Sequence, residues 1–175
     1  YSNGNGLYIR EILKFLDNQK ILTRVHGNWK VDLDKLSQAE IPPALRILLL
    51  EAINKYNPEL TRILELASVL EDEFEQEALR FVTDLSFENS FEILQKLLKD
   101  QILWAKKDPW GIKIKYSLAN LALKKILYER LSHKPNLHLR VANFYEERNY
   151  AKTPEGMLSL AFHFSQSPDY QKGYV

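Results

Sequence analysis

Four histidines and one run of carboxylates are the residues of this sequence that could support acid–base chemistry or bind a metal ion. His133 and His138 are five residues apart, a spacing that does not direct two imidazoles of one helix toward one metal. We therefore expect them to be ordinary surface or packing residues. The carboxylates fall within residues 71–75, where a solvated loop is the simpler interpretation, because a metal site would need ligands converging from elsewhere. The histidines are His26, His133, His138 and His163, and the carboxylates are Glu71, Asp72, Glu73 and Glu75.

Common motifs of catalytic and nucleotide-binding sites are missing from the sequence. It has no G-x-x-x-x-G-K-[ST] loop to cradle phosphates, and neither H-E-x-x-H nor G-x-S-x-G occurs. The absence of cysteine excludes disulfides and thiolate zinc sites. The sequence therefore predicts that this chain is not an enzyme, carries no cofactor or metal of its own, and does not hydrolyse ATP.

The composition is that of an ordinary globular protein. Of the 175 residues, 45% are hydrophobic and 27% are charged, and the formal net charge is +1. Such a balance gives no overall field toward nucleic acid or an anionic membrane. No apolar run approaches the roughly 18 residues that a membrane-spanning helix needs, and no signal peptide is evident. We expect a cytoplasmic location, with no membrane as a partner.

The first third of the chain predicts helices around a hairpin. Apolar residues at helical spacing indicate a helix over 7–16. Two β-favouring runs, 21–25 and 29–32, flank a Gly-Asn turn and predict a hairpin. We expect a polar connector over 33–40 and then a helix over 44–56, which follows two prolines.

The middle of the chain has the parts of a winged helix. Asn57 and Pro58 resemble a helix cap and first turn, and three helices are predicted, from about 57, over 75–85 and over 90–101. The pattern then changes to period two on either side of a turn at 108–111, which indicates a second hairpin. Four residues of this hairpin are expected to cover the core: Trp104, Trp110, Ile112 and Ile114.

Further helices are predicted over 118–131, 137–148 and 155–165. Another helix is expected to begin at Pro168, and it would be the third after residue 133. The predicted fold class is thus mainly α: a helical lid and a winged helix with two short β-hairpins, followed by the start of an α–α repeat array. We expect a lid with a hairpin over 1–56, a winged helix over 57–132 and tetratricopeptide-like repeats over 133–175. Four apolar residues of the last segment are expected to need further repeats or a partner to cover them: Phe144, Tyr145, Leu160 and Phe164.

A winged helix raises the alternative of a DNA-binding transcriptional regulator module. Its third helix normally enters the groove, but here acidic residues such as Glu88, Glu92 and Asp100 offset Lys96 and Lys99. The hairpin is more basic, with Lys106, Lys107, Lys113 and Lys115. A basic wing alone is weak evidence, so we expect protein partners and no DNA.

The order of these elements resembles the middle of a STAND-type signal-transduction ATPase, an AAA-related class. The segments that carry the resemblance are 4–13 (GNGLYIREIL), 41–46 (IPPALR), 64–70 (LELASVL), 116–131 and 160–173. The resemblance implies nucleotide contacts from Gly4, Asn5, Gly6, Leu7 and Asn120. Gly6 and Asn120 stand where the family usually has proline and histidine.

The resemblance also implies what the whole protein would contain. A P-loop domain binding ATP or ADP would precede Tyr1, and more helical repeats would follow Val175. This chain would then be a non-catalytic regulatory and interaction segment that relays nucleotide or partner state by rigid-body shifts between helical units. The effector, the output domain and the oligomeric state do not follow from the sequence.

Overall fold

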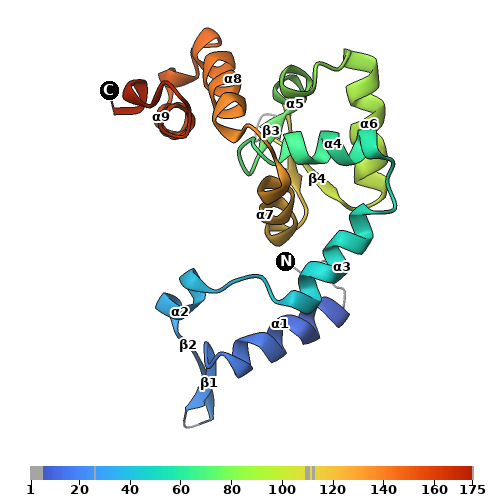
Figure 1. Ribbon diagram of the computed structural model, residues 1–175, viewed down its shortest axis with the longest axis vertical. Coiled ribbons are helices and arrows are strands. Elements are labelled where there is room, and N and C mark those ends of the chain that lie inside the picture. The colour runs from blue at the N-terminus through green and yellow to red at the C-terminus, as the bar shows by residue number, and fades with distance from the viewer. Residues whose placement is uncertain (1–5, 26, 109–110, 112, 175) are drawn as a thin grey trace. The chain divides into compact units, whose positions relative to one another are not determined.

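The computed structural model describes residues 6–25, 27–108, 111 and 113–174 (Figure 1). The fold is mainly helical, with one two-stranded and one three-stranded antiparallel sheet among these residues. The chain divides into two compact units, Tyr1–Tyr56 and Asn57–Val175. None of the described helices is long and apolar enough to cross a bilayer.

The first unit contains a hairpin between helices. Its hairpin has the expected strands, which pair from Leu22 with Val31 to Val25 with Asn28. Gly27 adopts a φ of 84° in the turn, a conformation that favours glycine. The elements are α1 (Gly6–Asn18), β1 (Leu22–Val25), β2 (Asn28–Val31), α2 (Leu33–Gln38) and α3 (Pro43–Ile53).

The polar connector expected over 33–40 is wrong, because most of it forms α2. A local cap explains the helix. The Asp32 carboxylate accepts a hydrogen bond from the Lys35 amide at 3.1 Å, and this satisfies one free N–H of the first turn. An N-cap can thus start a short helix where no periodic pattern of apolar residues predicts one.

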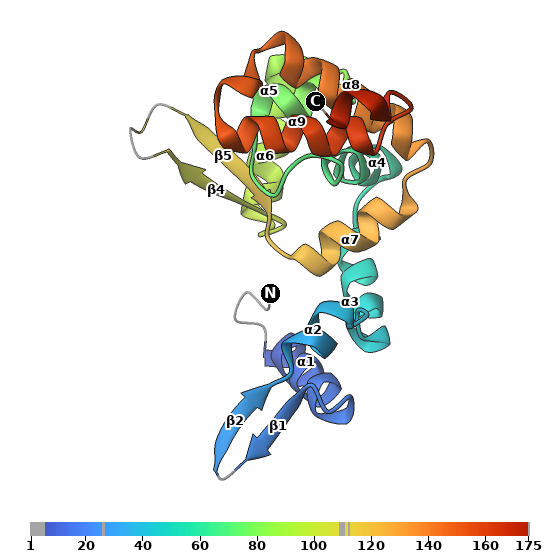
Figure 2. The same ribbon diagram turned by 90° about the vertical axis from the view of Figure 1, so that its left-hand side faces the viewer.

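The second unit begins with the winged-helix order of helix, strand, two helices and two strands. Its sheet has the order β3-β5-β4, and the β4–β5 hairpin projects away from the helices (Figure 2). The two-residue strand β3 was not predicted. The elements are α4 (Pro58–Ala67), β3 (Phe74–Glu75), α5 (Gln76–Thr83), α6 (Phe87–Lys99), β4 (Leu103–Lys107) and β5 (Ile114–Leu118).

Side-chain caps set where the helices of this part begin. The Asn57 side chain accepts from the Leu60 amide at 2.8 Å, which confirms the cap expected before Pro58. Ser86 accepts from the Asn89 amide at 3.1 Å, so α6 begins at Phe87 and not at about residue 90.

The expectation that Trp104 covers the core is wrong. Strand residues alternate between faces, and Leu103, at 2% exposed, takes the inward position while Trp104 is 51% exposed. Ile114 is also exposed, and Trp110 and Ile112 lie outside the described residues. The core of this part is formed instead by aliphatic side chains, among them Leu64, Leu79, Leu94, Leu97 and Leu103.

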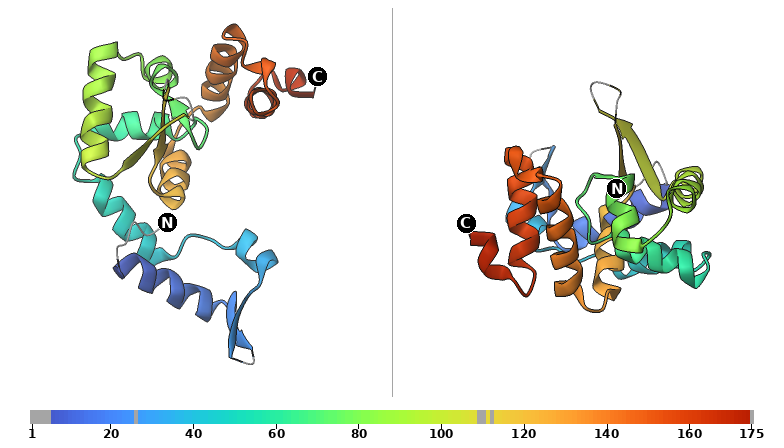
Figure 3. Two further views of the ribbon diagram at one scale, coloured as in Figure 1. Left: turned by 180° about the vertical axis from the view of Figure 1, so that it is seen from behind. Right: turned by 90° about the horizontal axis from the view of Figure 1, so that it is seen from above.

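Three α-helices and two 3₁₀ helices complete the second unit. Helix α7 packs against α4, α8 packs against α5, and α8 and α9 lie side by side (Figure 3). Leu118, expected to begin the first of these helices, belongs to β5. The elements are α7 (Leu121–Arg130), α8 (Lys134–Glu147), η1 (Tyr150–Lys152), α9 (Pro154–Ser165) and η2 (Tyr170–Tyr174).

Phe144, Tyr145 and Phe164 are buried and do not need further repeats to cover them, contrary to expectation. The ring of Phe144 packs on Phe81 with centroids 4.8 Å apart, and Tyr145 stacks on Tyr150 at 4.4 Å. The winged helix and η1 supply these partners, and neither contact is visible in a linear pattern.

Candidate functional site

A chain of hydrogen-bonded polar side chains crosses the interior of the second unit. Its members come from four places: Tyr128 from α7, His138 and Tyr145 from α8, His163 from α9, and Glu71 from the loop after α4. His138 and Tyr145 are seven residues apart, so they lie on the same face of α8. The site therefore joins the winged helix and α7 to the α8–α9 helical pair.

The two histidines meet nitrogen to nitrogen. His138 Nδ1 lies 2.8 Å from His163 Nδ1, and both side chains are only 1% exposed. At one end, the Tyr128 hydroxyl lies 2.9 Å from His138 Nε2. At the other end, His163 Nε2 lies 3.0 Å from Glu71 Oε1, and the Tyr145 hydroxyl donates to Glu71 Oε2.

One proton arrangement satisfies every member when both imidazoles are neutral and Glu71 is ionised. Tyr128 donates to His138 Nε2, and His138 Nδ1–H donates to His163 Nδ1. His163 Nε2–H then donates to the Glu71 carboxylate, as Tyr145 does from the other side. No buried side-chain nitrogen or oxygen of the described residues is left without a partner.

The environment favours a neutral His138 and an ionised Glu71. Burial lowers the pKa of His138 to about 4, and the nearby His163 adds to this against the opposing charge of Glu71. Burial alone would raise the pKa of Glu71, but the hydrogen bonds from His163 and from the Tyr145 hydroxyl bring it below its usual 4.5. Burial and the Glu71 carboxylate raise the pKa of Tyr145 far above its usual 10. Near neutral pH the site therefore holds a neutral His138 and one carboxylate.

A cleft of about 380 Å³ opens onto the Tyr128–His138 end of this chain. Its lining residues come from the segment just after α4, from α7, from α8 and from α9, and most of the lining surface is apolar. The lining consists of Ser68, Val69, Leu70, Asp72, Leu121, Lys124, Lys125, Tyr128, His138 and Phe162.

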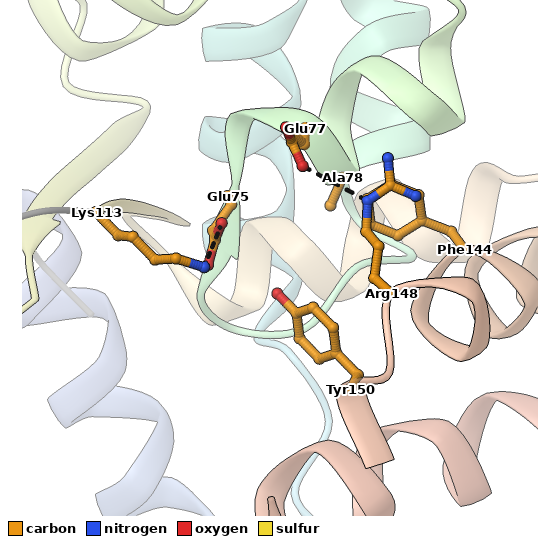
Figure 4. Close-up of a pocket in the computed structure, with 7 residues that line it drawn as sticks. All are labelled: Glu75, Glu77, Ala78, Lys113, Phe144, Arg148 and Tyr150. Atoms are coloured by element: carbon orange, nitrogen blue, oxygen red, sulfur yellow. Dashed lines mark hydrogen bonds and ion pairs between the residues drawn. The ribbon is translucent and has the colours of Figure 1, made fainter. Parts of the chain in front are cut away.

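A second cleft, of about 230 Å³, lies where α5 and the wing meet the end of α8 (Figure 4). Lys113 Nζ lies 2.8 Å from Glu75 Oε1, and Arg148 Nε lies 3.5 Å from Glu77 Oε2. The Tyr150 ring points into the space between these two pairs. Both cations that line the cleft are thus already matched by carboxylates, which leaves no excess charge there for an anion.

The residues predicted to contact nucleotide are not brought together within one unit. Gly4 and Asn5 lie outside the described residues, Gly6 and Leu7 begin α1 of the first unit, and Asn120 belongs to the second. The Asn120 side chain accepts from the amides of residues 122 and 123, at 2.8 and 3.2 Å, as the N-cap of α7. A nucleotide contact at these positions stays a prediction.

The acidic run is not uniformly a solvated loop, contrary to expectation. Glu71 is bound to His163 and Tyr145, and Glu75 lies in β3 and pairs with Lys113. The side chains of Asp72 and Glu73 remain exposed. Among the described residues, no group of three or more His, Asp or Glu side chains is arranged to hold a metal ion.

Sequence reasoning missed the histidine pair, because it compared His138 with its nearest neighbour His133 and not with His163. The available signal was the apolar run of residues 160–164, in which His163 stands between Phe162 and Phe164. A histidine inside an apolar run needs a hydrogen-bond partner. The sequence does not say which of the other polar residues supplies it.

No known family model matches this chain, and no curated protein matches it.

Proposed function

We propose that this chain is a non-catalytic regulatory and interaction segment of a larger cytoplasmic signalling protein of the STAND-type ATPase class. It would relay nucleotide or partner state between its winged helix and its helical pair, the α8–α9 start of a tetratricopeptide-like array. One observation carries the proposal: a continuous hydrogen-bonded chain joins Tyr128 and Glu71, on the winged-helix side, through His138 and His163 of the helical pair.

A relay needs a structural element with discrete arrangements, and the hydrogen-bonded side chains favour discrete arrangements of the helical pair. If α9 shifts enough to separate His163 from Glu71, a partly buried carboxylate loses its imidazole donor, which costs about 1–3 kcal/mol or more. The same shift breaks the contact between the two imidazoles, because His163 belongs to both. The helical pair is therefore either docked with every hydrogen bond made or displaced with several lost together.

The charges of the wing favour protein contacts over DNA. Lys106 and Lys115 both lie 3.7 Å from carboxylate oxygens of Glu73, and Lys113 pairs with Glu75. On α6, Lys96 lies 4.0 Å from Asp100. Cations paired in this way neutralise fewer phosphates than free ones. Duplex DNA binding measured by anisotropy across a salt series should give weak, non-specific affinity, whereas sub-micromolar affinity would favour the DNA-binding alternative.

Nucleotide belongs to the whole protein in this proposal. ATP or ADP would be held by an upstream P-loop domain, with the segment Gly4, Asn5, Gly6 and Leu7 and the position of Asn120 facing it by family resemblance. The chain alone should bind nucleotide weakly or not at all, and it should not turn ATP over.

Hydrogen–deuterium exchange tests the relay. Tyr128→Phe deletes the hydroxyl that donates to His138 and leaves a buried ring nitrogen without a partner. If the hydrogen-bonded side chains couple the winged helix to the helical pair, exchange should rise at amides of α9 and of the loop that carries Glu71, although neither contains Tyr128. Tyr116→Phe is the matched control, since it removes a phenol hydroxyl from a buried side chain of β5 that is not a member of the hydrogen-bonded series.

The pattern of exchange decides the outcome. A rise by one common factor at all protected amides would mean simple global destabilisation and would contradict the relay. A rise confined to α7 would contradict it as well.

A further inference from the structure

Helix α9 exposes more apolar surface than a peripheral helix needs. Leu158 and Phe162 are four residues apart and therefore lie on one face, and they are 73% and 54% exposed. Met157 is also exposed, and Ala161, between these residues on the helix surface, is partly exposed. A helix that is apolar on both its inner and its outer side is usually covered on both.

This face continues into the cleft described above. Phe162 lines the cleft, and so does the exposed Leu121 of α7. The buried residues Val69 and Leu70 also line the cleft, as does Tyr128. The result is a groove whose lining surface is mostly apolar but also includes Ser68, Asp72, Lys124, Lys125, Tyr128 and His138. A mostly apolar groove is the kind of surface onto which an amphipathic helix places its apolar face.

The rim of the groove is positively charged. Lys124 is matched by Asp72 at 2.7 Å, but Lys125 has no ion-pair partner among the described residues. Lys134 lies over the Tyr128 ring at 4.9 Å and approaches the Glu129 backbone oxygen, with no carboxylate pairing it within the described chain. Two uncompensated ammonium groups thus lie near Tyr128 at the side of an apolar groove.

We propose that this groove between α7 and α9 binds an acidic amphipathic helix of a protein partner, with leucine or aromatic residues on one face and carboxylates on the next. Its apolar face packs between Leu121 and Phe162, and its carboxylates pair with Lys125 and Lys134. This inference names the partner class within the proposed function and rests on it. Because Tyr128 and His138 line the groove, an occupant contacts the outer end of the hydrogen-bonded chain directly.

The test uses the 175-residue chain and a fluorescent 16-residue peptide built only of leucine, alanine and glutamate with an amphipathic period. Anisotropy should show saturable binding that weakens with salt. Phe162→Glu and Leu158→Glu should each weaken it at least tenfold, and Lys125→Glu should weaken it several-fold and flatten its salt dependence. Leu158 is largely solvated, so its variant should fold even if the Phe162 variant does not.

Controls separate the groove from general stickiness. Phe91→Glu changes a similarly exposed phenylalanine on α6, and Lys99→Glu makes the same charge change there, so both should bind as the unchanged chain does. A peptide with lysine in place of glutamate should not bind.

Three results would overturn the proposal: no saturable binding, equal binding of the lysine peptide, or equal loss in the α6 variants. Tighter binding to anionic vesicles than to the peptide would overturn it in favour of a lipid surface. None of these results affects the exchange test of the relay, which is made without peptide. The groove proposal and the relay proposal can therefore be refuted separately.

Discussion

At the scale of single residues, the contact between His138 and His163 has the largest chemical consequence. Two neutral imidazoles can share one proton between their Nδ1 atoms, but two protons there would oppose each other at 2.8 Å. The ionised Glu71 fixes the direction of the chain by accepting from His163 Nε2. The protonation state of one buried ring thus sets the donors and acceptors of its neighbours.

The first prediction concerns pH. His138 has a folded pKa of about 4, below the 6.5 of a free histidine, so its stabilising contribution is complete above pH 6.5 and is lost as the pH falls toward 4. The lowered pKa of Glu71 adds a further loss below about pH 4.5. The free energy of unfolding should therefore fall by up to roughly 3 kcal/mol between pH 6.5 and 4.

Urea unfolding at a series of pH values measures this loss. His138→Gln should flatten the curve between pH 6.5 and 4, whereas His133→Asn, at an exposed position, should leave its slope unchanged. A slope that persists in the His138 variant would assign the titration to another group.

At the scale of elements, alternation and capping decide the local structure. In β4 the period-two rule is obeyed, but its phase depends on which face meets the helices. The sequence could not give that phase, because Leu103 and Trp104 are both apolar. Caps were readable where asparagine preceded proline, at Asn57, and were missed where only a single Asp or Ser marked them, at Asp32 and Ser86.

The second prediction compares the two faces of β4. Leu103→Ala should lower the free energy of unfolding by about 2–5 kcal/mol, because the side chain is buried and leaves a cavity. Trp104→Ala should cost less than about 1 kcal/mol, because half of its surface is already solvated. Equal losses in chemical denaturation would mean that Trp104 packs against another part of the protein.

The third prediction concerns the cap of α7. Asn120→Ala should destabilise the chain by about 0.5–2 kcal/mol, because two amides of the first turn lose their acceptor. Asn120→Asp keeps an acceptor and should retain most of that stability. Thermal unfolding of both variants without nucleotide measures the cap alone. If alanine costs nothing under those conditions, Asn120 has another role.

At the scale of the molecule, the mainly helical class and the winged-helix order followed from periodicity, because period and punctuation are local properties of a sequence. The hydrogen-bonded contacts between the winged helix and the helical pair could not be predicted in this way. Glu71 and His163 are 92 residues apart, and Tyr145 reaches Glu71 from a different helix. A short acidic run looks the same whether its first member is solvated or meets a buried histidine. Long-range polar pairing of this kind needs the fold first.

The last prediction concerns the two units, because the buried apolar side chains are divided very unevenly between them. Among the described residues, only Ile21, Leu45, Leu49 and Ile53 of the first unit are buried and hydrophobic, whereas every other buried hydrophobic residue belongs to the second. Burial of apolar surface is the main favourable term in folding, and a segment of 56 residues with so few buried side chains has little to offset its chain entropy.

A chain of residues 57–175 should therefore unfold in one cooperative transition with a midpoint within a few degrees of the whole chain, roughly the shift that 1 kcal/mol produces in a domain of this size. A chain of residues 1–56 should show partial helicity by circular dichroism without a cooperative transition. Loss of cooperative unfolding in 57–175 would mean that the first unit completes the core of the second, and the boundary after Tyr56 would then not separate independent folding units.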